Sequence, residues 1–373
     1  MNRPSIPQVT YSSFSEDIHE RVTEERIPTD GTIELTYRCN LKCAHCYCSH
    51  DPIKPEMKYG EICRILDEVE EAGCLWLLLT GGEPLIRPDF TDIYTYAVRK
   101  GILVTLFTNG TLITPSIADH LRDYRPFSIE ITLYGATAET YEAVTGVRGS
   151  FEQCMNGIRL LLERGLPVKL KAMIMTLNKH ELPMMKQYAD KLGLEFRFDP
   201  AISPKLDGSK ATISLRISPE EIVELDLADD KRLKEWSSVC DKFWNSSYRD
   251  ELFTCGGGRN TFHINPYGEL KFCEMVMDYS YDLRNKPFKT GWYDFIPSVR
   301  AMKRTRDNRC KDCDVIPICD QCPGWALLEH NDPETPVDFL CEIAHIRAEA
   351  FGMVNRVPKG GGVYDSKETV SKT

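Results

Sequence analysis

The stretch Leu35-Thr-Tyr-Arg-Cys-Asn-Leu-Lys-Cys-Ala-His-Cys-Tyr47 decides how the chain is interpreted, because it places Cys39, Cys43 and Cys46 in the order C-x-x-x-C-x-x-C. A structural zinc site or a closed four-iron cluster takes four protein ligands, whereas this tight loop offers three thiolates. The loop follows residues 32–37, a β-branched and apolar run that predicts a strand. Catalytic metals keep one coordination position open, so the sequence predicts a catalytic metal centre at the end of this strand.

The bulk composition is that of an ordinary soluble globular protein. The chain has 373 residues, enough for one large domain and a smaller one, and its net charge of −10 argues against a nucleic-acid partner. No apolar run approaches the roughly 20 residues of a membrane span, and the start lacks a signal-peptide core, so we expect no membrane contact and a cytoplasmic location. Disulfides are rare in that compartment, so metal ligation is the better explanation for most of the 15 cysteines.

Short apolar runs alternate with amphipathic stretches from Gly31 onward. The predicted strands are residues 32–37, 75–79, 102–107, 128–133, 168–175 and 194–198. They are apolar with little alternation, as expected of parallel strands that are buried on both faces. Helices are predicted to start at Thr114-Pro115 and at Ser150, and Gly165 and Gly193 are predicted helix stops. This pattern predicts a parallel α/β sheet, and a doubly wound sheet or a partial barrel would both satisfy it.

The alternation stops after about residue 199. Ser218-Pro-Glu-Glu221 predicts one more helix, and a cysteine-dense stretch then runs from Cys240 to Cys341 with few apolar runs. A stretch with so small a core is expected to depend on bound metal clusters for its folding.

The segment from Glu34 to Tyr47 resembles the signature of radical S-adenosylmethionine (SAM) enzymes, and the similarity covers roughly residues 30 to 350. The resemblance implies an α/β fold, namely a partial (β/α)6 radical SAM barrel followed by a cysteine-rich SPASM domain. We therefore expect an N-terminal extension over residues 1–30, the barrel over 31–235, the SPASM auxiliary-cluster domain over 236–352 and a disordered tail over 353–373.

A second motif, Thr80-Gly-Gly-Glu-Pro84, follows the second predicted strand. Two glycines allow a backbone to approach a ligand closely, and a glutamate accepts hydrogen bonds from an amine, although a bare Gly-Gly-Glu also occurs in turns. The motif is similar to the GGE motif that contacts the SAM amine in this family. The resemblance implies cofactor contacts from Tyr47, Gly81, Gly82, Glu83 and Pro84.

Three further residues are predicted to point toward the same end of the barrel. Thr132 ends the fourth strand where relatives bind the SAM ribose, although Tyr134 replaces their aspartate and Thr132 is equally explained as an ordinary strand residue. Asn109 and Lys171 are weaker cofactor-binding candidates, since an Asn-Gly turn needs no function.

The later cysteines are similar to the seven-cysteine SPASM motif, which binds two auxiliary [4Fe–4S] clusters in peptide-modifying relatives. They are Cys255, Cys273, Cys310, Cys313, Cys319, Cys322 and Cys341. One departure is that two residues separate Cys319 from Cys322, where three are commoner. Zinc is the alternative metal for this set.

The family topology implies how these cysteines are shared between two clusters. Cys310, Cys313, Cys319 and Cys341 would hold the distal cluster; we call them the distal group. Cys255, Cys273 and Cys322 would hold the proximal cluster; we call them the proximal group. Cys240 is the one nearby candidate for a fourth proximal ligand, so that cluster is either closed by Cys240 or open for substrate.

Glu274 follows Cys273 directly and is a candidate catalytic base. In sulfatase-maturing relatives an aspartate at the matching place acts as base on the substrate. Here the carboxylate is one methylene longer, and a solvated surface glutamate is the competing interpretation.

The resemblance implies an enzyme with SAM and three [4Fe–4S] clusters as cofactors. One cluster would cleave SAM to methionine and a 5′-deoxyadenosyl radical, which takes hydrogen from a peptide or protein side chain and leads to a crosslink, thioether or carbonyl, as in the maturation of ribosomally made peptides. The competing classes are a dehydrogenase of a small molecule, of aminoglycoside or tetrapyrrole type, and a non-catalytic iron–sulfur electron carrier.

The implied partners are the substrate and a reductant such as flavodoxin or ferredoxin. Small leader-binding domains often precede the barrel in the peptide maturases, and about 30 residues are too few for one. A separate leader-peptide-binding protein is therefore expected, unless the substrate carries no leader.

Overall fold

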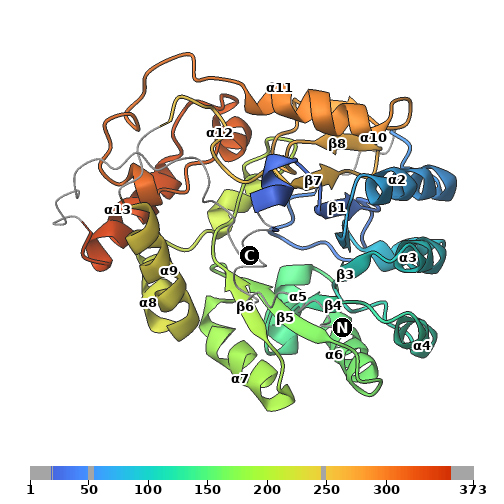
Figure 1. Ribbon diagram of the computed structural model, residues 1–373. Coiled ribbons are helices and arrows are strands. Elements are labelled where there is room, and N and C mark those ends of the chain that lie inside the picture. Colours follow the sequence, from blue (N-terminus) through green and yellow to red (C-terminus); the bar gives the residue numbers. More distant parts are fainter. Residues whose placement is uncertain (1–17, 19, 49–53, 245–248, 354–373) are drawn as a thin grey trace, which may run out of the picture.

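The computed structural model describes residues 18, 20–48, 54–244 and 249–353 (Figure 1). Most of the predicted N-terminal extension, and all of the predicted tail except Met353, lie outside the described residues.

Six parallel strands form the barrel wall and confirm the predicted fold class (Figure 1). They are β1 (Asp30–Glu34), β2 (Trp76–Thr80), β3 (Leu103–Thr108), β4 (Ser128–Thr132), β5 (Val168–Met173) and β6 (Phe196–Asp199). Each strand pairs in parallel with the next one along the chain, so the six carboxyl ends meet at one rim. Ile33, Leu79 and Leu106 are fully buried, as the apolar runs predict.

Helices cover the outside of the strands (Figure 1). They are α2 (Tyr59–Glu71), α3 (Phe90–Arg99), α4 (Pro115–Asp123), α5 (Ala138–Thr145), α6 (Ser150–Leu162) and α7 (Leu182–Leu192). Thr114 caps α4 by accepting a hydrogen bond from Ile117 N, and Gly193 ends α7 with φ at 66°. The predicted starts and stops of these helices are therefore confirmed.

The sheet continues into the C-terminal region, which the sequence pattern does not predict. Strand β7 (Thr261–Ile264) pairs in parallel with β1, and β8 (Glu269–Lys271) and β9 (Ser280–Asp282) follow in antiparallel order. Gly31 permits this pairing, because a Cβ there would lie 2.0 Å from the ring of Phe262. One sheet therefore crosses the predicted boundary at residues 235 and 236.

The rest of the C-terminal region is built from short helices that flank the barrel. They are α8 (Pro219–Ala228), α9 (Asp230–Phe243), α10 (Phe288–Thr290), α11 (Ile296–Arg300), α12 (Pro323–His330) and α13 (Asp338–Ala350). Helices α8, α9 and α13 lie side by side (Figure 1). The buried Asp226 of α8 connects them, because it accepts hydrogen bonds from Arg347 of α13 (2.8 and 3.1 Å) and forms an ion pair with Arg232 of α9. Among the described residues, no helix is long and apolar enough to cross a membrane.

Candidate active site

The first three cysteines lie in the loop that leaves β1, as predicted. The backbone of this loop is fastened to the end of α5, since Lys42 N donates to Thr145 O (2.8 Å) and Ala44 N donates to Val144 O (2.9 Å). The three thiols lie close enough to influence one another. Burial, together with the neighbouring thiolates, raises the pKa of Cys39 and raises that of Cys43 to about 12. A hydrogen bond from Cys48, a residue that sequence reasoning left without a role, lowers the pKa of Cys46 to about 6.

Gly81 and Gly82 are needed for contact with the cysteine loop itself. A Cβ at Gly81 would lie 2.2 Å from Thr36 O, and a Cβ at Gly82 would lie 2.5 Å from Arg38 O. Gly82 N donates to Thr36 O (2.7 Å), so the end of β2 and the start of the loop are joined backbone to backbone. The sequence argument assigned these glycines to ligand approach, whereas the close approach in the structure is between two segments of the chain.

Glu83 is fully buried beside this junction, and three donors hold its carboxylate. Oε1 accepts hydrogen bonds from Thr108 Oγ1 (2.8 Å) and Leu85 N (3.1 Å), and Oε2 accepts one from Asn109 N (2.7 Å). A carboxylate offers about four acceptor positions, so one position remains, on Oε2. Burial raises the pKa of Glu83 to about 7. Pro84 follows within a short 3₁₀ turn and is buried.

The other predicted cofactor residues line the carboxyl ends of the strands. Thr132 ends β4, and its hydroxyl makes no hydrogen bond with the described residues, which leaves it available to a ligand. Lys171 Nζ lies 2.8 Å from the ring centre of Phe107 and 4.0 Å from Glu130, and burial lowers its pKa well below the usual range. Tyr47 packs in a small apolar cluster on the other side of the loop.

Tyr134, which replaces the aspartate of many relatives, has its own contacts in this structure. Its hydroxyl hydrogen-bonds the thiol of Cys43, and its ring lies 5.4 Å from that of His45 and 5.4 Å from that of Tyr141. The substitution therefore adds a contact to the cysteine loop.

The later cysteines fall into the two predicted groups. In the proximal group, burial raises the pKa of Cys273 to about 12, and the thiolates of Cys322 and Cys255 add to that effect. In the distal group, burial raises the pKa of Cys319 to about 12, with further contributions from Cys310 and Cys341. Cys313, the fourth member of this group, also lies 3.7 Å from Nε2 of His345 on α13, a neighbour that the sequence did not indicate. The structure thus brings the members of each group together, and cluster ligation remains a prediction.

Cys240 lies beside the distal group. It is 1% exposed within an apolar cluster formed with Val315 and Ile318, and Cys313 and Cys319 pack against that cluster. This position does not favour Cys240 as the fourth ligand of the proximal cluster and supports the alternative in which that cluster keeps an open position.

Glu274 is half-buried and lies among ionisable residues of the barrel interior. Burial raises its pKa, whereas the nearby charges of His263 and Lys171 lower it. Burial raises the pKa of Tyr47 in the cysteine loop, and the charge of Glu274 adds to that effect. Its role as a catalytic base stays a prediction.

Two residues that sequence reasoning missed complete the same interior. Nε2 of His263 on β7 lies 3.0 Å from Oε2 of Glu34, the last residue of β1. The hydroxyl of Tyr37 donates a hydrogen bond to the same oxygen (2.8 Å). Oε1 of Glu34 is buried without a hydrogen-bond partner among the described residues. The carboxylates of Glu34 and Glu274 outweigh the effect of burial and raise the pKa of His263. The pairing of β1 with β7 creates this contact, so no local sequence pattern could reveal it.

The chemistry of the donors favours iron–sulfur clusters. Three groups of thiols are soft ligands that suit such clusters. A zinc ion needs four ligands, with each sulfur about 2.3 Å from the metal. Within the described residues, no three His, Cys, Asp or Glu side chains converge closely enough to hold one metal ion.

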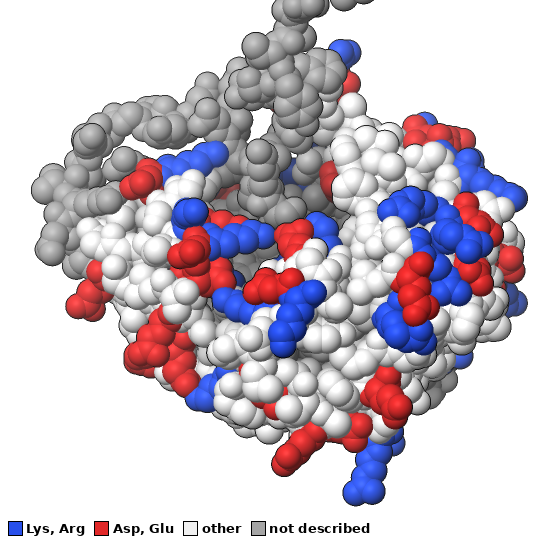
Figure 2. All heavy atoms as spheres, turned by 90° about the horizontal axis from the view of Figure 1, so that it is seen from below, with Lys and Arg blue, Asp and Glu red and all other residues white. Residues whose placement is uncertain are grey.

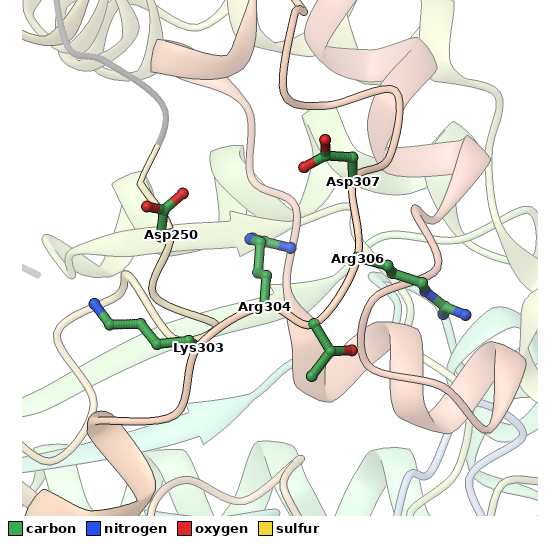
Figure 3. Close-up of a pocket in the computed structure, with 6 residues that line it drawn as sticks. Asp250, Lys303, Arg304, Arg306 and Asp307 are labelled. Atoms are coloured by element: carbon green, nitrogen blue, oxygen red, sulfur yellow. The ribbon is translucent and has the colours of Figure 1, made fainter.

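A pocket at the surface of the described residues is a second candidate site. Figure 3 shows a pocket lined by Asp250, Lys303 and Arg304, but Lys303 is already paired with Glu251 (2.5 Å), and the neighbouring Arg306 is paired with an aspartate. Figure 2 shows acidic and basic side chains interspersed around a hollow, with no wide basic patch on that face.

Comparison with known proteins agrees with the geometry. Residues 33–192 match the radical SAM superfamily. The chain is 31% identical over 318 residues to mycofactocin maturase MftC of Mycobacterium tuberculosis, which covers 82% of this chain and 80% of the relative. It is 26% identical over 336 residues to AdoMet-dependent heme synthase of Methanosarcina barkeri, a match that covers 80% of this chain and 92% of the relative. The chain belongs to the radical SAM superfamily and is a radical SAM enzyme related to peptide maturases.

Solved structures give the same fold. SuiB of Streptococcus suis superposes with a TM-score of 0.68 when bound to S-adenosylmethionine and 0.67 when bound to the precursor peptide SuiA. Each covers 91% of this chain and 83% of SuiB, at 16% and 17% sequence identity. The predicted partial barrel with its C-terminal extension is therefore confirmed as the fold.

Proposed function

We propose that this protein modifies a peptide or protein side chain oxidatively, with SAM bound at the loop of Cys39, Cys43 and Cys46 and auxiliary clusters on the proximal and distal groups. The bound SAM cluster would supply one electron that cleaves SAM and thereby generates the species that abstracts hydrogen. The chain itself would orient SAM, enclose the reacting groups and accept the proton that leaves the substrate. We assign these tasks to a barrel over residues 31–235 and to an auxiliary-cluster domain over 236–352.

The observation that carries this proposal is the position of Glu274. Glu274 is half-buried in the turn after β8 and directly follows Cys273 of the proximal group, and the charges of His263 and Lys171 act on its carboxylate. Oxidation of a side chain after hydrogen abstraction requires one more electron and one proton to leave the substrate. A base next to a cluster ligand can take the proton at the place where the cluster can take the electron.

The residues around the predicted SAM site support the binding step. Glu83 presents one free acceptor position to the SAM amine, and Thr132 has a hydroxyl that no described residue occupies. Asn109 holds Glu83 through its backbone N–H, and Lys171 Nζ lies 2.8 Å from the ring centre of Phe107 on the strand that leads to Asn109.

The experiment that tests the proposal is anaerobic reconstitution followed by reduction with dithionite in the presence of SAM. We expect about twelve irons per chain, as three [4Fe–4S] clusters require, and formation of 5′-deoxyadenosine. Replacing Cys39, Cys43 and Cys46 together by Ala should abolish 5′-deoxyadenosine and leave the auxiliary clusters in place. Stoichiometric zinc in the wild type, or SAM cleavage that persists in the triple variant, would refute the proposal.

The substrate is proposed to be a precursor peptide, presented by a separate leader-peptide-binding protein, with flavodoxin or ferredoxin as the reductant. Similarity to MftC and to SuiB, whose structure holds a precursor peptide, supports this class. A short peptide encoded beside this protein is the first candidate, and its mass change on incubation with SAM tests it. Glu274→Gln should then keep SAM cleavage but lose the mass change.

A second candidate is oxidation of a tetrapyrrole side chain, because the heme synthase of M. barkeri matches over 92% of its length. A mass change on a tetrapyrrole carboxylate, with none on the peptide, would favour it.

A further inference from the structure

Asn109 connects the predicted SAM-binding carboxylate to a predicted cluster ligand. Its backbone N–H donates to Glu83 Oε2 (2.7 Å). Its side-chain Nδ2 donates to Asn40 Oδ1 (3.0 Å) and lies 3.8 Å from the sulfur of Cys39, within reach of an N–H···S hydrogen bond. One buried residue therefore contacts both halves of the site, and the function proposed above uses only the first contact.

The orientation of the Asn109 amide is fixed by its neighbours. Oδ1 accepts hydrogen bonds from Thr111 N (2.9 Å) and Thr111 Oγ1 (2.6 Å). A backbone N–H can only donate, so the amide oxygen must face Thr111 and the NH₂ group must face Cys39. Because Asn109 is only 5% exposed, water does not compete for these bonds.

Cys39 accepts a second hydrogen bond, from Leu41 N at 3.4 Å. Reduction of a cluster adds negative charge that spreads onto its sulfurs, so donors directed at those sulfurs stabilise the reduced form. Hydrogen bonds to the sulfurs are among the factors that set the potential of an iron–sulfur cluster. The Leu41 bond comes from the backbone and is present in any sequence, whereas the Asn109 bond depends on the side chain.

We propose that Asn109 is a positioning residue that raises the reduction potential of the cluster held by Cys39, and so makes its reduction easier. The inference rests on the proposed function, because it assumes that Cys39 holds a cluster. The step concerned is the transfer of one electron from a reductant such as dithionite to the oxidised cluster; no covalent bond forms or breaks. A side-chain substitution leaves the backbone N–H to Glu83 in place, so potential and SAM binding can be separated.

The test compares Asn109→Leu and Asn109→Ser with a matched control, Asn178→Ser. Asn178 is also a buried asparagine, but its amide bonds only backbone groups of Tyr134, Met173 and Met175. Redox titration of the reconstituted full chain, monitored by electron paramagnetic resonance, follows the signal that shifts when SAM is added.

We expect both Asn109 variants to lower the potential by about 59 mV, a tenfold change in the one-electron equilibrium. The control should keep the wild-type potential.

Several outcomes would overturn the inference. One is a wild-type reduction potential in Asn109 variants that contain as much iron as the wild type. Another is a shift of the reduction potential in Asn178→Ser as large as that in the Asn109 variants. Loss of the cluster from both Asn109 variants but not from the control would show that the role is structural only. If the wild type has no SAM-responsive cluster, the proposed function fails first, and this outcome is distinct from the others.

Discussion

Replacing Glu83 by Gln tests how SAM is held. The carboxylate accepts three hydrogen bonds from the protein, which leaves one acceptor position on Oε2, beside Asn109 N. A glutamine of the same shape has one oxygen and one NH₂ group, so it cannot satisfy all these donors and also accept from the SAM amine. The variant should therefore bind SAM more weakly while keeping the shape of the site.

The size of the loss follows from the bond that is removed. A hydrogen bond to a charged group contributes roughly 1.5–3 kcal/mol. Since about 1.4 kcal/mol corresponds to a factor of ten, the dissociation constant of SAM should rise between roughly tenfold and 150-fold. Thr108→Val removes one donor to the far oxygen and leaves Oε2 unchanged, so it should have a smaller effect and serves as the control.

The assay is anaerobic titration of the reconstituted protein with SAM, followed by the change in the paramagnetic resonance signal of the reduced cluster. Iron content must equal that of the wild type, so that weaker binding is not confused with cluster loss. A dissociation constant within twofold of the wild type in Glu83→Gln would refute this assignment of the SAM amine.

Four further outcomes are expected. Because burial raises the pKa of Glu83 to about 7, the difference in SAM affinity between wild type and Glu83→Gln should shrink as the pH falls below 7. Cys240→Ala should leave the resonance signal of the proximal cluster unchanged; an altered signal would show that Cys240 is a ligand. Asp226→Asn removes the charge that pairs with buried Arg347 and should lower the free energy of unfolding, measured with urea, by about 3–5 kcal/mol. The control Glu163→Gln, at an exposed ion pair, should lower it by less than about 1 kcal/mol. The pKa of His263 is raised on folding, so protonated His263 stabilises the folded protein relative to the His263→Gln variant. This difference in the free energy of unfolding should be complete below about pH 6.5 and lost as the pH rises through the folded-state pKa, which urea unfolding at a series of pH values measures.

The barrel could be predicted from sequence because its information is local. Each of the six strands has four to six residues and overlaps a predicted strand, and the helices between them have ordinary caps such as Thr114 and Gly193. Strands β7 to β9 have only three or four residues each, too few for a pattern. They form because the ring of Phe262 packs directly against Gly31, which has no side chain, and because β7 pairs with the edge of β1 that β2 does not use. Both conditions exist only in the folded chain.

The candidate site also has one part that local sequence patterns predicted and another that depends on contacts in the folded chain. The cysteine spacings and the Gly-Gly-Glu motif indicated which residues matter, and the structure brings these residues together. The contact between Glu34 and His263 spans 229 positions in the sequence, so spacing could not indicate it. The close approach of Gly81 to Thr36 O could not be predicted for a related reason, since it joins two separate segments of the chain; a cofactor contact of Gly81 stays a prediction.

The parallel pairing of β7 with β1 is what relates the two halves of the proposed chemistry. Strand β1 leads into the cysteine loop, and the turn after β8 carries Cys273 and Glu274. Both segments are fixed by one sheet, so the predicted SAM cluster and the proximal group cannot move independently of each other. A substrate held between them would meet the abstracting radical on one side and, on the other, a carboxylate and a cluster ligand that are consecutive in sequence. The C-terminal region also shares the hydrophobic core of the barrel, to which it contributes Phe262, Leu270 and Trp292, so the small core expected from its sequence is not what the structure shows. A flexible linker in place of this attachment would not keep the proposed proton acceptor and electron acceptor at the same place.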